Sequence, residues 1–165
     1  MTTAYVALGS NVGKRQTALR AALSRLGQIP RTTVTAVATF RQTQPVDCPP
    51  EMPAFINSAA EIETSLEAPD FLVWLLQIER DLGRQRSPLA KHEARTIDLD
   101  LIFFGESILT LPDLVIPHPR MQVRRFVLEP LAEIAPEFRH PLSGKTMREL
   151  LHALDSTAPV ERIAG

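Results

Sequence analysis

With 165 residues, the chain is long enough for one domain with a single buried core, and no linker-like segment divides it. Hydrophobic residues make up 44% of the sequence and charged residues 22%, which argues against a disordered chain and against a membrane-embedded one. The formal net charge of -1 removes the global electrostatic argument for a nucleic-acid-binding protein. We therefore expect a single domain over residues 1–165 whose partners are small molecules, with no nucleic acid and no membrane among them.

The sequence shows neither the pattern of a signal peptide nor the cysteines for an internal disulfide bond. Residues 1–5 lack the basic stretch that begins a signal peptide, and no apolar run approaches the roughly 20 residues that cross a bilayer. Cys48 is the only cysteine, so an internal disulfide framework cannot form. We expect a cytoplasmic protein, and a monomer.

The first third of the chain alternates between strand and helix patterns. The apolar run Tyr5–Leu8 predicts a short strand, which the turn residues after it terminate. Apolar residues then recur every four positions over Ala18–Leu26 and predict a helix that ends at Gly27. From Thr33 to Phe40 apolar and polar residues alternate, which is typical of a half-buried strand.

The middle of the chain repeats this alternation. Prolines crowd the segment from Gln42 to Pro53, and since proline lacks the N–H that regular structure needs, we expect a loop there. Phe55–Thr64 alternates as a third strand. A second helix should begin near Pro69 and end at Gly83, because apolar residues recur at helical spacing between them. Thr96–Phe104 predicts a fourth strand.

The order of these elements defines a fold class. Strand, helix, strand, strand, helix, strand is the order of a ferredoxin-like βαββαβ unit, an α+β fold with an antiparallel sheet and both helices packed on one face of it. The remaining residues form a C-terminal extension. In it we expect a short strand near Ile108, an irregular stretch through Pro119, and helices near Met121–Ile134 and Met147–Leu154. We expect the extension to cover a sheet edge and to contribute residues to a site.

An acidic pair in the fourth strand is the sharpest chemical signal. Asp98 and Asp100 should project from one face, with their Cβ atoms roughly 6.5 to 7 Å apart, while Ile97, Leu99, Leu101 and Phe103 project from the other. Neighbouring carboxylates repel unless a cation lies between them, and their oxygens suit Mg²⁺, which also binds phosphate oxygens. The alternative is a solvated face of an edge strand.

Basic residues flank this acidic pair on both sides. Four precede it, namely Arg84, Arg86, Lys91 and Arg95, and four follow it, namely His118, Arg120, Arg124 and Arg125. Guanidinium groups bind phosphate oxygens in pairs, so arginine beside an acidic metal pair suits phosphoryl transfer. The neighbouring prolines restrict the backbone that carries His118. A solvated, charged loop is the other interpretation of these residues.

Residues Ser143–Thr146 end like a phosphate-binding loop but lack its context. Arg139 stands where that loop requires glycine, and no apolar strand leads into the segment. We interpret it as a turn followed by a helix whose N-cap is Thr146.

Several separate motifs, in order along almost the whole chain, resemble those of the 6-hydroxymethyl-7,8-dihydropterin pyrophosphokinase family. They are Ala7–Asn11, Phe55–Ala59, Leu82–Arg84, Arg95–Asp100, Pro117–Met121 and Arg124–Leu128. The resemblance implies a transferase of folate biosynthesis in which ATP is the co-substrate and binds before the pterin. The 6-hydroxymethyl oxygen of the pterin would attack the β-phosphorus of ATP and release AMP.

The resemblance also implies roles for individual residues on the nucleotide side. Asp98 and Asp100 would hold two Mg²⁺ ions. The catalytic residues would be Arg84, Arg95, Asp98 and Asp100. The residues that contact ATP would be Glu79, Arg84, Arg86, Arg95, His118 and Arg124.

On the pterin side, the resemblance implies one amide, two aromatic rings and a loop. Asn57 would hydrogen-bond the ring edge, and Phe55 and Phe126 would hold the flat ring between them. The full pterin set would be Thr43, Gln44, Pro45, Val46, Phe55, Asn57, Asp98 and Phe126. An amide and two aromatic rings are what a planar, polar-edged heterocycle requires, although ordinary strand packing explains the same residues.

This sequence departs from the family pattern at three places. His92–Ala94 stands where some members have Trp-Gly-Pro, Gln44 replaces a frequent proline, and Leu76 lies where some members have a glutamine near adenine. None of these positions belongs to the acidic pair.

Two other functions are compatible with parts of this pattern. A two-metal nucleotide phosphohydrolase would use the same Asp98 and Asp100, with Glu79 completing a site for the attacking water. A non-catalytic ligand-binding module is the other, because ferredoxin-like folds host many functions.

Overall fold

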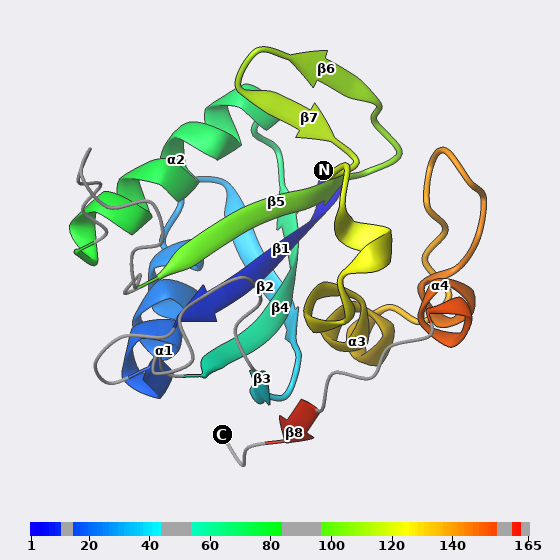
Figure 1. Ribbon diagram of the computed structural model, residues 1–165. Coiled ribbons are helices and arrows are strands. Elements are labelled where there is room, and N and C mark those ends of the chain that lie inside the picture. The colour runs from blue at the N-terminus through cyan, green and yellow to red at the C-terminus, as the bar shows by residue number, and fades with distance from the viewer. Residues whose placement is uncertain (11–14, 44–53, 84–96, 155–159, 163–165) are drawn as a thin grey trace.

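A computed structural model describes residues 1–10, 15–43, 54–83, 97–154 and 160–162. At its centre is an antiparallel sheet of six strands in the order β5-β1-β4-β3-β8, with β2 also paired to β4 (Figure 1). The strands are β1 (Thr2–Ser10), β2 (Thr32–Val37), β3 (Arg41–Thr43), β4 (Phe55–Thr64), β5 (Asp98–Phe104) and β8 (Val160–Arg162). The expected antiparallel, ferredoxin-like sheet is confirmed.

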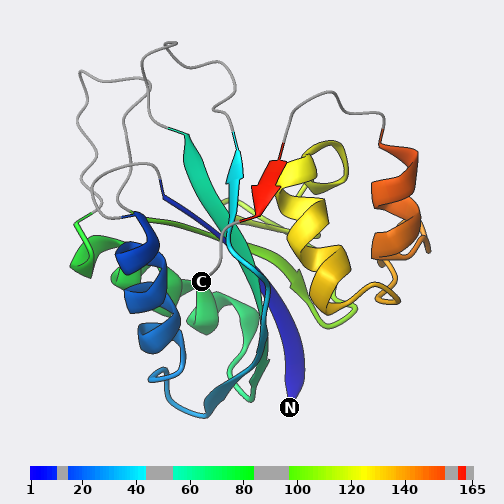
Figure 2. The ribbon, with the colours of Figure 1, turned by 90° about the horizontal axis from the view of Figure 1, so that it is seen from below.

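Two helices cover one face of this sheet, as the sequence predicts (Figure 2). They are α1 (Arg15–Leu26) and α2 (Ala68–Asp81), and α2 has proline in its first turn and ends just before Gly83, whose φ of 95° only glycine adopts readily. Their apolar stripes meet the sheet in one core. It includes Leu19, Leu26, Phe71, Leu75 and Ile78 from the helices and Val6, Leu8, Ile62 and Leu99 from the strands.

The opposite face of the sheet carries the C-terminal extension. Helix α3 (Arg125–Ile134) packs across it, with α4 (Met147–Ala153) beyond (Figure 2). A second core forms there from Tyr5, Ala7, Ala59, Phe103, Val127, Leu128 and Leu131. The helices of the extension therefore cover a face of the sheet and not an edge, whereas its segment from Leu114 to His118 contacts the edge strand β5, as expected. An apolar stripe along α3 has more surface to bury against a sheet face than against an edge strand.

Several predicted boundaries need correction. The strand expected to run to Phe40 stops at Val37, and Gln42 and Thr43, expected in a loop, belong to β3. The helix expected over Met121–Ile134 is split at Arg124 into a 3-10 turn (η1, Met121–Val123) and α3. The strand near Ile108 is one arm of a hairpin, β6 (Leu109–Leu111) with β7 (Leu114–Ile116), and β7 lies in the stretch expected to be irregular. Cross-strand pairing, which the local sequence does not encode, decides the strand boundaries among these.

A bulge in β5 overturns one predicted side-chain direction. Tyr5 pairs with Phe103 and the next residue, Val6, pairs with Leu101, so Ile102 is an extra residue in β5. Leu99 and Leu101 lie in the core under α1 and α2, but Phe103 lies in the core under α3, opposite to the prediction. The extra residue reverses the alternation beyond it and leaves the positions before it unchanged.

The turn at Ser143–Thr146 is structural, as predicted. The Thr146 hydroxyl accepts from the backbone N–H of Glu149 at 3.1 Å, and the Glu149 carboxylate accepts from the N–H of Thr146 at 3.1 Å. This reciprocal pair is a capping box that begins α4.

Beside this turn, the buried position of His140 predicts that the stability of the fold depends on pH. Its Nδ1 accepts hydrogen bonds from the N–H groups of Leu142 (3.1 Å) and Ser143 (3.3 Å), and burial lowers the pKa of His140. The unfolded chain then binds a proton more readily than the folded chain, so stability present above pH ~6.5 is lost as the pH falls toward the folded pKa. In urea unfolding, we expect His140→Asn, which keeps an acceptor, to lose less stability between pH 7 and 5 than the wild type. An equal or larger loss would contradict this.

Candidate functional site

Four strands bring their residues into one row at an end of the sheet. Arg41 on β3 pairs with Asn57 on β4, Asn57 with Gly9 on β1, and Gly9 with Asp98 on β5. Because partners across a sheet project from the same face, Asn57 and Asp98 face the same side, separated only by a residue without a side chain. Asp100 follows on that side of β5, next to Ala7. The sheet therefore aligns the predicted pterin-binding amide with the predicted metal ligands.

Gly9 is a glycine because Asn57 occupies the space above it. A Cβ at position 9 would lie 2.9 Å from Oδ1 of Asn57 and 3.9 Å from a ring carbon of Phe55. The Asn57 side chain is itself only 5% exposed, so it has little room to retreat. The sequence motif around Gly9 is thus explained by the close approach of an amide side chain.

We expect Gly9→Ala to displace the Asn57 amide and to weaken pterin binding by about tenfold or more, since misplacing a recognition group costs one to two orders of magnitude. Pterin affinity can be measured by calorimetry. Gly27→Ala is the matched control, because a Cβ there meets its nearest atom, the Ser24 carbonyl oxygen, at an ordinary 3.5 Å. Unchanged affinity in Gly9→Ala would contradict the predicted role of Asn57.

Beside this row a pocket of about 390 Å³ opens along the outer edge of β5. Half-buried Asp98 and Asp100 line it, together with Glu79 of α2, the β6–β7 hairpin, and His118. The sequence therefore correctly predicts an acidic pair facing a common space. Leu72, Leu76, Leu114 and Val115 supply its apolar wall.

Glu79 links α2 to the strand that bears the acidic pair. It is 3% exposed, and its Oε2 accepts a hydrogen bond of 2.7 Å from the backbone N–H of Leu99, which lies between Asp98 and Asp100. An edge strand leaves backbone donors without a neighbouring strand, and a buried donor needs a partner. Glu79 supplies that partner and so holds β5 at the point where the two aspartates project.

His118 is held against the other half of β5. Its backbone N–H donates to the carbonyl of Ile102 at 3.1 Å, and its Nδ1 accepts from the N–H of Arg120 at 3.3 Å. Burial of the ring and the positive charges of Arg124 and Arg120 lower the pKa of His118, although Asp98 acts in the opposite direction. The neutral imidazole is therefore the favoured form at pH 7, and it lies within electrostatic reach of both Asp98 and Arg124.

Arg124 and Phe126 stand where η1 gives way to α3. Arg124 is the N-cap of α3, and its guanidinium carbon lies 5.7 Å from the centroid of the Phe126 ring, a cation–π contact. Phe126 is half-buried in the first turn of the helix, on the sheet face that Asn57 and Phe55 share. Phe55 begins β4 two residues before Asn57.

Of the remaining predicted residues, six lie outside the described part of the chain and one lies at the end of a strand. Arg84, Arg86 and Arg95, and likewise Gln44, Pro45 and Val46, lie outside the described residues. Thr43 ends β3, where its backbone pairs with Phe55. The described part of the site thus consists of Glu79, Asp98, Asp100 and His118 at the pocket, with Phe55, Asn57, Arg124 and Phe126 from the neighbouring elements.

The donor set fits a magnesium ion that is completed by a substrate. Among the described residues no group of three or more His, Cys, Asp or Glu side chains gathers as a ready-made metal site. Mg²⁺ is usually bound through one or two carboxylates plus phosphate oxygens and water. Asp98 and Asp100 can provide the carboxylates, and the pocket beside them is open to a phosphate group and to water.

The local sequence does not reveal the structural role of two residues of this region. Arg41 is 1% exposed, and nothing in its local sequence separates it from a surface arginine. Gly9 belongs to a turn motif, but its close approach to Asn57 depends on pairing with a strand 48 positions later.

None of the helices in the described part of the chain has the length and the apolar composition that a membrane span requires.

Fold and site together define an α+β protein of ferredoxin-like topology with an acidic pocket along its edge strand. A family model described as 7,8-dihydro-6-hydroxymethylpterin-pyrophosphokinase (HPPK) matches residues 5–136. The chain belongs to this family.

Two curated relatives align with this chain over most of its length. A protein of Pseudomonas aeruginosa named 2-amino-4-hydroxy-6-hydroxymethyldihydropteridine pyrophosphokinase is 40% identical over 161 residues, which are 98% of this chain and 96% of the relative. A Bacillus subtilis protein of the same name is 44% identical over 147 residues, 88% of this chain and 86% of the relative.

Solved structures support the fold. The Plasmodium falciparum HPPK-DHPS wild type with pteroate has a TM-score of 0.72 and 15% identity, over 92% of this chain. This chain spans 42% of that longer one. At this identity the likeness shows the fold alone.

Proposed function

We propose that this protein transfers pyrophosphate from ATP to the 6-hydroxymethyl group of 6-hydroxymethyl-7,8-dihydropterin, a step of folate biosynthesis. The hydroxymethyl oxygen attacks the β-phosphorus, the bond from that phosphorus to the α,β-bridging oxygen breaks, and AMP leaves as the hydroxyl proton is lost. Family membership over most of the chain supports the reaction. The observation that carries it is the pairing of Asn57, Gly9 and Asp98 in one row beside the acidic pocket.

Asp98 and Asp100 are proposed to hold two Mg²⁺ ions. When bound, these ions would screen the triphosphate charge and polarise the β-phosphoryl group. The protein keeps both carboxylates on one side of β5, and Glu79 of α2 holds this strand in place by accepting a hydrogen bond from the N–H of Leu99. Preorganised groups of this kind cost no reorganisation at the moment of reaction.

On the nucleotide side, we assign Glu79, His118 and Arg124 to the ATP-binding set. His118 and Arg124 lie within electrostatic reach of each other, and because Nδ1 of His118 accepts from Arg120, the neutral imidazole carries its proton on Nε2 and can donate one hydrogen bond from there. Arg84, Arg86 and Arg95 complete the proposed set, with Arg84 and Arg95 stabilising the charge that develops on the transferred group.

On the pterin side, we assign the ring edge to Asn57 and the ring faces to Phe55 and Phe126. Residues Thr43, Gln44, Pro45 and Val46 would add backbone contacts, and Asp98 would lie next to the reacting hydroxyl. The pairing of β4 with β1 and β5 supports this arrangement, because it brings Asn57 into the same row as Asp98. Holding both substrates in this orientation accounts for much of the rate that such enzymes achieve.

The test is product analysis with MgATP in the presence and absence of the pterin alcohol. We expect AMP and the pterin diphosphate in equal amounts, and AMP only when the pterin alcohol is present. AMP release without it would favour the nucleotide phosphohydrolase. Absence of AMP together with retained binding of ATP would favour the non-catalytic module. The single domain, the monomeric state and the cytoplasmic location stay predictions.

A further inference from the structure

A charged side chain is buried under α3, near the proposed pterin site. Arg41, on β3, is 1% exposed and is among the largest fully buried side chains of the described residues. Arginine keeps its charge at any working pH, and a buried charge costs several kcal/mol unless it is paired and hydrogen-bonded. The placement of Arg41 therefore calls for a compensating set of partners.

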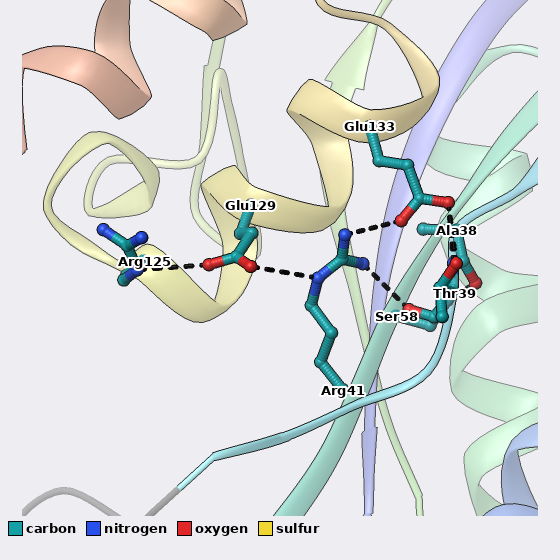
Figure 3. A network of polar contacts seen from close by, with 7 residues as sticks. All are labelled: Ala38, Thr39, Arg41, Ser58, Arg125, Glu129 and Glu133. Carbon is teal, nitrogen blue, oxygen red and sulfur yellow. Dashed lines mark hydrogen bonds and ion pairs between the residues drawn. The ribbon is translucent and has the colours of Figure 1, made fainter. Parts of the chain in front are cut away.

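Two carboxylates and a carbonyl provide that compensation (Figure 3). Nε of Arg41 lies 3.3 Å from Oε1 of Glu129, one terminal nitrogen lies 2.5 Å from Oε1 of Glu133, and the other donates to the Thr39 carbonyl at 2.9 Å. Both glutamates belong to α3, one turn apart. A planar guanidinium can engage three acceptors in different directions at once, which a lysine ammonium on a flexible stem does less well.

The network extends further along α3 and is neutral as a whole. The second oxygen of Glu129 accepts from Nε of Arg125 at 3.1 Å, and the second oxygen of Glu133 accepts from the Thr39 N–H and hydroxyl, each at 3.0 Å. Burial opposes the charge of Glu133, but the bonds from Thr39 and Arg41 outweigh it and lower the pKa of that carboxyl. Two positive and two negative groups thus form the network, and Arg41 ties the helix to β3.

This attachment lies next to residues of the proposed site. Arg41 is the direct cross-strand partner of Asn57. On α3, Glu129 and Glu133 lie one and two turns after Phe126, and Arg124 immediately precedes the helix. The rotation and height of α3 above the sheet therefore determine where Phe126 and Arg124 stand relative to Asn57.

We propose that Arg41 is a positioning residue for pterin binding: by binding Glu129 and Glu133 at once, it sets α3 so that Phe126 lies correctly opposite Asn57. This inference rests on the proposed function, because it concerns the pterin half of that site. Arg41 touches no reacting atom in this role, and acts through the helix.

The test is steady-state kinetics with each substrate varied in turn, on the full chain. We expect Arg41→Lys, which keeps the charge but not the fork, to raise KM for the pterin alcohol by about tenfold or more while KM for MgATP changes less than about twofold. Glu133→Gln should shift KM in the same direction. The matched control is Arg25→Lys, which alters the exposed ion pair with Asp81 (2.6 Å) on the other face of the sheet.

A second variant guards against a folding defect. Arg41→Met combined with Glu133→Met removes both charges, and replacement of a buried ion pair by apolar groups is often tolerated. We expect this double variant to fold and to show the same selective rise in the KM of the pterin alcohol.

The outcomes separate this inference from the function on which it rests. A wild type that forms no AMP with the pterin alcohol overturns both. A wild type that performs the transfer, with Arg41 variants whose two KM values are unchanged or rise together, overturns the positioning role alone. A selective rise in the KM of the pterin alcohol supports it.

Discussion

Asp98→Ala and Asp100→Ala should each lower kcat by about a thousandfold or more, because loss of a group that stabilises developing charge costs two to three orders of magnitude and a metal ligand at least as much. Both side chains are half-buried beside the pocket and lie outside the two hydrophobic cores. We therefore expect the thermal unfolding temperature to change little. Rapid measurement of AMP formation and a melting curve would check the two statements separately.

The control for this prediction is Asp113→Ala. Asp113 lines the same pocket from the hairpin turn, is exposed, and is not a proposed metal ligand. It changes the charge by the same amount, so a general electrostatic effect would reduce kcat in all three variants. Turnover within about tenfold of the wild type in either β5 variant would argue against metal ligation there. An unfolded Asp100→Ala protein would show that this side chain is required for the packing of the core.

Glu79→Ala should destabilise the fold and lower activity together. It removes the acceptor of the Leu99 N–H and leaves a buried donor unpaired, at a cost of about 1–3 kcal/mol. For a chain of this size that corresponds to a fall of roughly 3–10 °C in the unfolding temperature. Because the N–H lies between the two aspartates, we also expect a fall in kcat of at least about tenfold as β5 loosens.

Glu79→Gln distinguishes support of the strand from a requirement for charge. The amide keeps one acceptor oxygen of nearly the same shape, so most of the stability should return. Val73→Ala, at a position that is 60% exposed on the same helix, controls for changes in helix propensity. The prediction fails if Glu79→Ala unfolds at the temperature of the wild type, or if the glutamine variant is no more stable than the alanine variant.

Much of the framework follows from local patterns. Phe55–Thr64 is a strand with the predicted bounds, and the second helix ends before the predicted glycine. These elements combine clear periodicity with unambiguous end signals, so local preference and tertiary packing agree. The same agreement explains why the direction of Asp98 and Asp100 is predicted correctly: both precede the bulge at Ile102.

The errors lie where distant pairing overrides the local pattern. Phe103 turns to the other face because one extra residue enters β5, and Gln42 joins a strand because β4 offers a partner edge. Helix α3 lies on the face of the sheet because its apolar stripe meets a second core there. No stretch of neighbouring residues contains this information.

By itself, the sequence determined the order of the strands and helices of the βαββαβ unit, the family, and the acidic pair, since residue type and spacing encode each of them. Only the tertiary structure decided that the Asn57 side chain lies over Gly9, in the same row as Asp98. The same holds for the hydrogen bond from the backbone between the two aspartates to Glu79, and for the burial of Arg41 between two glutamates. Each of these contacts joins residues at least 20 positions apart. Their closeness depends on strand register and helix packing, which arise when the whole chain buries its apolar surface at once.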